Sequence, residues 1–92
     1  MPKRNKISLL GQSYVADLLA SISEKPKMFK DLSPVCPNER TRSKKLKELV
    51  EEGLVTTVAL KVERRHFVHY KLTEKGKKLV RALSAIKDII RE

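Results

Sequence analysis

Cations dominate the residues of this chain that could do chemistry, and five of them fall within eight positions. They are Arg40, Arg42, Lys44, Lys45 and Lys47. Arginine can bond guanine bidentately, lysine can neutralise a phosphate, and the interspersed Thr41 and Ser43 can reach bases or phosphates. This segment meets one acid, Glu39, before Glu48, whereas a self-stabilising helix face would alternate charges four residues apart. We therefore expect residues 40–47 to face a polyanion.

A second group of cations lies in the polar loop between two β-rich runs. It comprises Lys61, Arg64 and Arg65. At the tip of a hairpin these side chains could reach a phosphate backbone or a minor groove. Turns are commonly polar for other reasons, so this cluster matters mainly because it accompanies the cations of 40–47.

The chain as a whole is also basic. Its 92 residues include 21 Lys and Arg against 11 Asp and Glu, which gives a net charge of +10. Such an excess attracts nucleic acid or anionic membranes, although solubility alone can also explain a basic surface. No apolar run is long enough to span a membrane, and no signal peptide is recognisable at the start. We expect double-stranded DNA as the partner and no membrane.

Two histidines invite a metal hypothesis, because His66 and His69 have a spacing known from zinc sites. They fall on a predicted strand, where positions three apart point to opposite faces. The pair therefore should not converge on one ion, and we expect no metal site.

The single cysteine, Cys36, lies between Val35 and Pro37 in the turn before the cationic segment. A thiol sensor at this place could couple oxidation to binding. The sequence offers no resolving cysteine, however, and free cysteines are usually buried as small apolar residues. One unpaired cysteine fits a reducing compartment, so we expect a cytoplasmic protein.

Catalytic constellations are missing from the sequence. It contains no phosphate-binding loop, no supported Ser-His-Asp set, no paired-carboxylate pocket and no cofactor fingerprint. A chain of this length is also small for a substrate cleft of the usual volume. We expect neither enzymatic activity nor a cofactor.

The spacing of apolar residues indicates the elements that must position these side chains. We expect a basic flexible arm at 1–6 and one domain over 7–92. Its elements would be helices at 12–24, 28–33, 38–52 and 74–91, with a β-hairpin at 54–72. An amphipathic stripe spaced three and four apart runs from Ile7 to Ile22, and the first helix covers its secure part because Gly11 weakens the start. The stripe is formed by Ile7, Leu10, Tyr14, Val15, Leu18, Leu19 and Ile22. The fold class is then mainly α with a small hairpin (α+β).

Local signals predict where these helices begin and end. Ser13, Asn38 and Thr73 are suitable N-caps, and Gly53 can end the helix at 38–52 in a left-handed conformation. In that helix we expect Leu46, Leu49 and Val50 to face inward. Because all three lie in its second half, the first half is left for an external partner.

Three motifs together resemble a known family of domains. They are 28–32 (MFKDL), 46–55 (LKELVEEGLV) and 70–76 (YKLTEKG), the last two separated by a hairpin-sized stretch. Residues 17–83 resemble the winged helix-turn-helix domain of small bacterial and archaeal transcriptional regulators of the HxlR, MarR and ArsR kind. The resemblance implies a three-helix core with a C-terminal dimerisation helix, DNA binding through the third helix and wing, and usually a homodimer.

The sequence departs from this resemblance at Arg42, where such families commonly place an apolar residue. Either Arg42 faces DNA, or its stem packs inside while its head reaches the surface. Both alternatives are compatible with the sequence.

The helix at 74–91 bears on assembly. Its apolar residues form a seam, namely Leu79, Leu83, Ile86, Ile89 and Ile90, and the last three extend past the predicted core. A partner's matching helix, with residues 7–10 joining in, would cover them. The alternative is a monomer whose C-terminus folds back on the first helix.

Taken together, these features predict a sequence-specific, homodimeric DNA-binding regulator. Arg40 and Arg42 are the candidates for base contacts, and Lys44, Lys45, Arg64 and Arg65 for phosphates, with Thr41, Ser43 and Lys61 beside them. The alternative function is a non-enzymatic architectural or interaction module that holds non-specific DNA, structured RNA or a protein.

Overall fold

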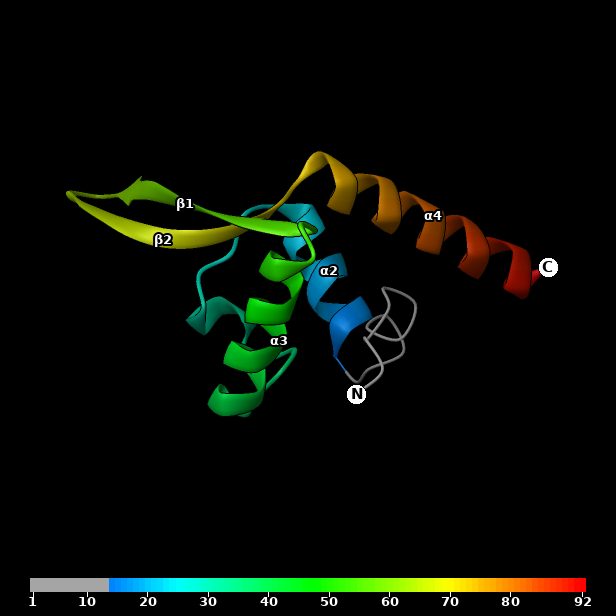
Figure 1. Ribbon diagram of the computed structural model, residues 1–92, viewed down its shortest axis with the longest axis horizontal. Coiled ribbons are helices and arrows are strands. Elements are labelled where there is room, and N and C mark those ends of the chain that lie inside the picture. Colours follow the sequence, from blue (N-terminus) through cyan, green and yellow to red (C-terminus); the bar gives the residue numbers. More distant parts are fainter. Residues whose placement is uncertain (1–13) are drawn as a thin grey trace.

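Three helices, one turn of 3-10 helix and a two-stranded hairpin make up residues 14–92, the part of the chain that this computed structural model describes (Figure 1). The order is α2 (Val15–Glu24), η1 (Lys30–Leu32), α3 (Glu39–Glu51), β1 (Val55–Val62), β2 (Arg65–Leu72) and α4 (Glu74–Arg91). The arm expected at 1–6, the contribution of residues 7–10 and the cap at Ser13 lie outside the described residues. Within residues 14–92 no helix is long and apolar enough to cross a membrane.

The stripe predicted for the first helix is buried along α2. Val15, Leu18, Leu19 and Ile22 are inaccessible or nearly so, and this spacing puts all four on one side of the helix. Tyr14, expected in the stripe, instead occupies the N-cap with a left-handed backbone (φ 71°) and is exposed. The helix ends at Glu24, and Lys25 before Pro26 is extended, as proline requires of the residue before it.

The second helical segment is shorter than the predicted 28–33. It is a single 3-10 turn, Lys30–Leu32, that buries Leu32 in the core. The backbone N–H of Met28 donates to the Asp31 carboxylate at 3.1 Å. That local hydrogen bond favours a tight turn, and Pro34 then prevents its extension.

Helix α3 has the caps that the sequence predicts. The Asn38 side chain accepts a hydrogen bond from the Thr41 N–H at 2.9 Å, and Gly53 follows the C-terminus with φ 73°. The inward side differs from the prediction, because Leu46 and Leu49 are buried whereas Val50 is 39% exposed. Arg42 takes the third inward position.

The hairpin formed by β1 and β2, called the wing from here on, turns at Glu63 and Arg64. Its antiparallel register pairs Val55 with Leu72 at the base and Val62 with Arg65 at the tip. Glu63 adopts a left-handed conformation (φ 59°) that a two-residue turn needs. The base is buried in the core and the outer part extends away from the body (Figure 1). Tyr70 exchanges two backbone hydrogen bonds with Lys27, which tie the wing to the segment before η1.

Contacts between the end of α3 and the start of α4 close the domain. The Thr73 hydroxyl donates to the Gly53 carbonyl and accepts from the Gly76 N–H. The Thr73 N–H donates to the Leu54 carbonyl, and a Cβ on Gly76 would clash with that carbonyl oxygen. The motifs at 46–55 and 70–76 are therefore two halves of one junction, which we call the α3–α4 junction.

Beyond this junction α4 leaves the core. Leu79 and Val80 pack against the core cluster, but Ile86, Ile89 and Ile90 are 52%, 66% and 75% exposed. Figure 1 shows α4 and the wing extending in opposite directions from the helical body.

Candidate nucleic-acid interface

The outward side of α3 carries cations at helical spacing. Arg40, Lys44 and Lys47 are exposed and stand three or four residues apart, so they share one face of the helix. With Ser43, Glu39 and Phe29 they line a shallow hollow beside η1. Lys47 is not among the contact residues predicted from the sequence, although its spacing from Lys44 places it on this face. We call this surface the α3 face.

Arg42 is not on the α3 face, which corrects its prediction as a base-reading residue. It is 3% exposed and lies on the inward side, four residues before Leu46. Its guanidinium donates to the carbonyls of Cys36 (2.9 Å), Phe29 (3.3 Å) and Pro37 (3.1 Å).

The Phe29 ring lies under the Arg42 guanidinium, 4.5 Å from ring centroid to Cζ. Neither alternative for Arg42 is met in full, because the stem packs inside while the head also stays buried. The charge is tolerated there because backbone carbonyls and an aromatic face replace water around it.

Thr41 and Lys45 lie at the edge of the α3 face. Both are half-buried, and the N–H of Thr41 is used by the Asn38 cap. Of the residues predicted in this helix, the structure therefore groups Arg40, Ser43 and Lys44 and leaves Thr41 and Lys45 beside them.

The wing tip divides its cations between two sides. Arg64 and Arg65 line a hollow together with Lys30, Val62 and Phe67, and Glu63 is the one acid among its lining residues. Lys61 pairs with His66, one position away from the pair formed by Val62 and Arg65. Since neighbouring positions on a strand point to opposite faces, Lys61 and Arg65 face opposite ways.

The segment that holds η1 connects these two basic surfaces. Phe29 borders the hollow of the α3 face, and Met28 and Lys30 border the hollow of the wing tip. Lys30, which sequence reasoning did not single out, adds a cation between them. The result is a basic strip from α3 across η1 to the wing tip, and its charge would attract a polyanion along its length.

Comparison with known proteins identifies the family and the fold of this chain. Residues 9–92 match the sequence profile of the HxlR-like helix-turn-helix proteins. The chain belongs to the HxlR-like helix-turn-helix family. A search of curated protein sequences gave no match.

Solved structures of transcriptional regulators share the fold of this HxlR-like chain. The reduced form of the regulator YodB from B. subtilis is 27% identical, with a TM-score of 0.78 over 89% of this chain and 81% of that one. The redox regulator HypR in its reduced form is 24% identical (TM-score 0.75; 89% and 82% covered). A MarR-family regulator from Porphyromonas gingivalis is 17% identical (TM-score 0.74; 100% and 98% covered).

These findings make the HxlR-like chain a winged helix-turn-helix protein of a DNA-binding, transcription-regulating family. The mainly α fold with a small wing, predicted from the sequence, is confirmed. In such domains the recognition helix enters the major groove of DNA, and α3 has the corresponding place in the fold.

The two histidines and the cysteine of this HxlR-like chain have different surroundings, and only His66, which pairs with Lys61, lies at the wing tip. His66 is exposed, whereas His69 is 7% exposed with Nδ1 2.8 Å from the Phe67 carbonyl. Cys36 is fully buried in the core, and its carbonyl accepts the Arg42 hydrogen bond. Among the described residues no group of three or more His, Cys, Asp or Glu side chains could hold a metal ion.

Proposed function

We propose that this chain binds double-stranded DNA at a preferred sequence and regulates transcription there. The main support for this proposal is the α3 face. Its hollow is lined by three exposed cations, Arg40, Lys44 and Lys47, and by one acid, Glu39. Arg40, nearest the helix N-terminus, would contact bases, with Thr41 and Ser43 beside it. Lys44, Lys45 and Lys47 would contact phosphates, because the first turns of a recognition helix lie deepest in the groove.

The wing would contact the flanking backbone. Arg64 and Arg65 share a hollow with Lys30, so these three would follow the same phosphate strand. Lys61 lies on the opposite face of the wing from Arg65, and it would contact a second phosphate or the wall of the minor groove.

The second part of the proposal is a homodimer held by α4. Ile86, Ile89 and Ile90 form an exposed apolar stripe beyond the core, and Leu79 and Leu83 continue it toward the domain. Burying three isoleucines against a second copy would contribute on the order of several kcal/mol. Two-fold symmetry would then place two recognition helices about one turn of DNA apart. A DNA target and an unpaired thiol also favour a cytoplasmic location.

Selection of bound sequences from random duplexes, followed by anisotropy titration at several salt concentrations, tests the proposal. We expect an enriched, two-fold symmetric site and a binding constant that falls steeply with salt. Salt-sensitive binding without an enriched sequence would favour the architectural module instead. Absence of duplex binding would contradict the proposal and would favour a module that holds structured RNA or a protein.

A further inference from the structure

Phe29 is the one apolar residue among the described residues that line the hollow of the α3 face. The others carry a charge or a hydroxyl group: Glu39, Arg40, Ser43, Lys44 and Lys47. Phe29 comes from outside α3, at the start of η1, and it is half-buried. Part of an aromatic side chain therefore borders the surface on which the proposed DNA contacts lie.

The position of Phe29 is fixed from the core side by Arg42 and Leu32. The Phe29 carbonyl accepts hydrogen bonds from the Arg42 guanidinium at 3.3 Å and from the Leu32 N–H at 3.2 Å. The guanidinium also lies over the ring, 4.5 Å from its centroid, and Phe29 packs against the core cluster. Because these contacts already order the side chain, little conformational entropy is lost when it meets a partner. The ring is thus a preorganised contact surface.

An apolar surface among cations has few matching groups in the major groove of DNA. The base edges present hydrogen-bond donors and acceptors there, and the C5-methyl group of thymine is the one apolar group. Phosphates are charged and suit Arg40, Lys44 and Lys47 rather than an aromatic ring. The thymine methyl group is therefore the group that complements Phe29.

We propose that Phe29 packs against the C5-methyl group of a thymine, so that the chain prefers a T·A pair at one position of its target. This inference rests on the proposed function, because it requires α3 to lie in the major groove. It adds a residue from outside the recognition helix to the base contacts and names the base that this residue favours. Arg40 would contact its base through hydrogen bonds, whereas Phe29 contacts a methyl group by burying apolar surface.

Deoxyuridine scanning of the site-selected duplex tests this contact. Deoxyuridine keeps the hydrogen-bonding groups of thymidine, so each replacement removes the methyl group alone. At the thymine that contacts Phe29, anisotropy titration should show an affinity about fourfold lower, as expected for one buried methyl group. 5-Bromodeoxyuridine at the same position should restore the affinity, because bromine is similar in size to a methyl group.

Two phenylalanine variants assign the effect to a residue. Phe29→Ala should reduce the ratio of thymidine to deoxyuridine affinity at that position from about four to about one. Phe67→Ala removes the other phenylalanine of the chain, which lines the hollow of the wing tip, and should leave the ratio unchanged. Phe29→Ala also loses packing against the core, and circular dichroism measures its folded fraction. The ratio remains informative, because a smaller folded fraction lowers both affinities equally.

Nuclear Overhauser spectroscopy of the unaltered chain on the duplex provides a measurement that needs no variant. We expect contacts between the ring protons of Phe29 and the methyl protons of the thymine that deoxyuridine scanning identifies. A purely structural role of Phe29 would produce no such contacts.

The outcomes distinguish this inference from the proposed function. An enriched site that tolerates deoxyuridine at every thymine would overturn the inference and leave the proposed function intact. The same conclusion would follow from an unchanged ratio in Phe29→Ala, or from a sensitive methyl group whose Overhauser contacts reach other residues and not Phe29. A chain that binds no duplex would overturn the proposed function and this inference together.

Discussion

Two arginines two positions apart on α3 have opposite environments. Arg42 donates three hydrogen bonds to backbone carbonyls of the turn and of the segment before it, so it connects α3 to the preceding residues. Arg40 is exposed at the edge of the hollow on the α3 face. One side chain contributes to stability and the other is available to a partner.

Replacing Arg42 should therefore unfold the domain more readily. Arg42→Ala removes the donor of the Cys36 and Pro37 carbonyls and one of the two donors of the Phe29 carbonyl, which keeps the Leu32 N–H. It also opens a cavity, and we expect the free energy of unfolding to fall by about 3 kcal/mol. Arg42→Met keeps the bulk without the donors and should lose less. Urea denaturation followed by circular dichroism measures both. An Arg42→Ala variant as stable as the parent would contradict the structural role of this residue.

Arg40→Ala is the matched comparison. Because Arg40 is exposed, its removal should change the free energy of unfolding by no more than about 0.5 kcal/mol. Affinity for the preferred duplex should fall about tenfold, with relaxed preference at one base pair. Anisotropy titration against a panel of single-base variants tests this. Unchanged affinity would remove Arg40 from the proposed contacts.

At the scale of elements, the α3–α4 junction holds the wing between two helices. Gly76 lies in the first turn of α4, directly against the Leu54 carbonyl. The Thr73 hydroxyl caps α4 and also donates a hydrogen bond to the Gly53 carbonyl. The close approach at position 76 needs a residue without a Cβ. The two hydrogen bonds at position 73 need a hydroxyl group that can both donate and accept.

Gly76→Ala should weaken this junction although alanine is the better helix former. The added Cβ would collide with backbone, so we expect a loss of about 2 kcal/mol in the free energy of unfolding. Lys78→Ala, at an exposed position of the same helix, serves as the control with a change near zero. Thermal denaturation compares the two. Equal stability of the variants would mean that α4 can shift without cost.

Thr73 offers a second test of the junction. Thr73→Val preserves the shape and removes both hydrogen bonds, so the free energy of unfolding should fall by about 1–2 kcal/mol. Thr73→Ser keeps the hydroxyl and should recover most of that loss. Denaturant titration of the pair distinguishes the hydroxyl from the packing of the methyl group, and failure of serine to recover stability would assign the effect to the methyl group.

At the scale of the whole molecule, the isoleucines of α4 favour association with a second copy, whereas the basic strip favours binding to DNA. The isoleucine stripe lies far along a helix that has left the core, so folding of one chain does not bury it. The net charge of +10 opposes association of copies and favours binding to DNA.

Ile86→Ser with Ile89→Ser should break the proposed homodimer. Light scattering should give twice the chain mass of 10.5 kDa for the unaltered protein and the chain mass itself for the variant, because the buried apolar area is lost. The control K87S/D88S changes two neighbouring positions off the stripe at constant net charge and should stay dimeric. A parent protein with the mass of one chain would exclude the dimer.

Salt dependence tests the basic strip. Each phosphate contact contributes about 0.9 to the slope of log binding constant against log salt concentration. K44A/K47A should therefore lower that slope by about 1.8 per recognition helix, with similar losses for specific and random duplexes. Fluorescence titration between low and physiological salt measures it. An unchanged slope would show that these lysines do not reach phosphates.

Much of this protein follows from its sequence, because helix ends, strand alternation and turns depend on neighbouring residues. Asn38, Gly53 and Thr73 have the predicted capping conformations or hydrogen bonds, and the tip of the wing is at the predicted polar break. Even the burial of Arg42 had a signal, since it stands four residues before Leu46 and seven before Leu49 on the same side of the helix.

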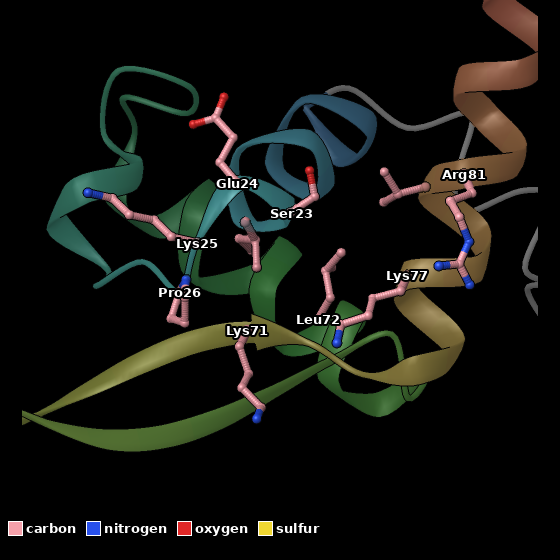
Figure 2. A pocket seen from close by; sticks show the side chains of 10 residues that line it. Ser23, Glu24, Lys25, Pro26, Lys71, Leu72, Lys77 and Arg81 are labelled. Atoms are coloured by element: carbon pink, nitrogen blue, oxygen red, sulfur yellow. The ribbon is translucent and has the colours of Figure 1, made fainter.

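Tertiary structure decided the rest, because those features depend on residues distant in the chain. Whether a charge can stay buried at position 42 is set by three carbonyls outside its helix. The grouping of Lys30 with Arg64 and Arg65 depends on how the wing folds beside η1. The cleft of Figure 2 exists only because the end of α2, the end of β2 and the first turns of α4 meet around it. Local sequence therefore determined the elements and their cationic segments, and packing determined which cations face outward together.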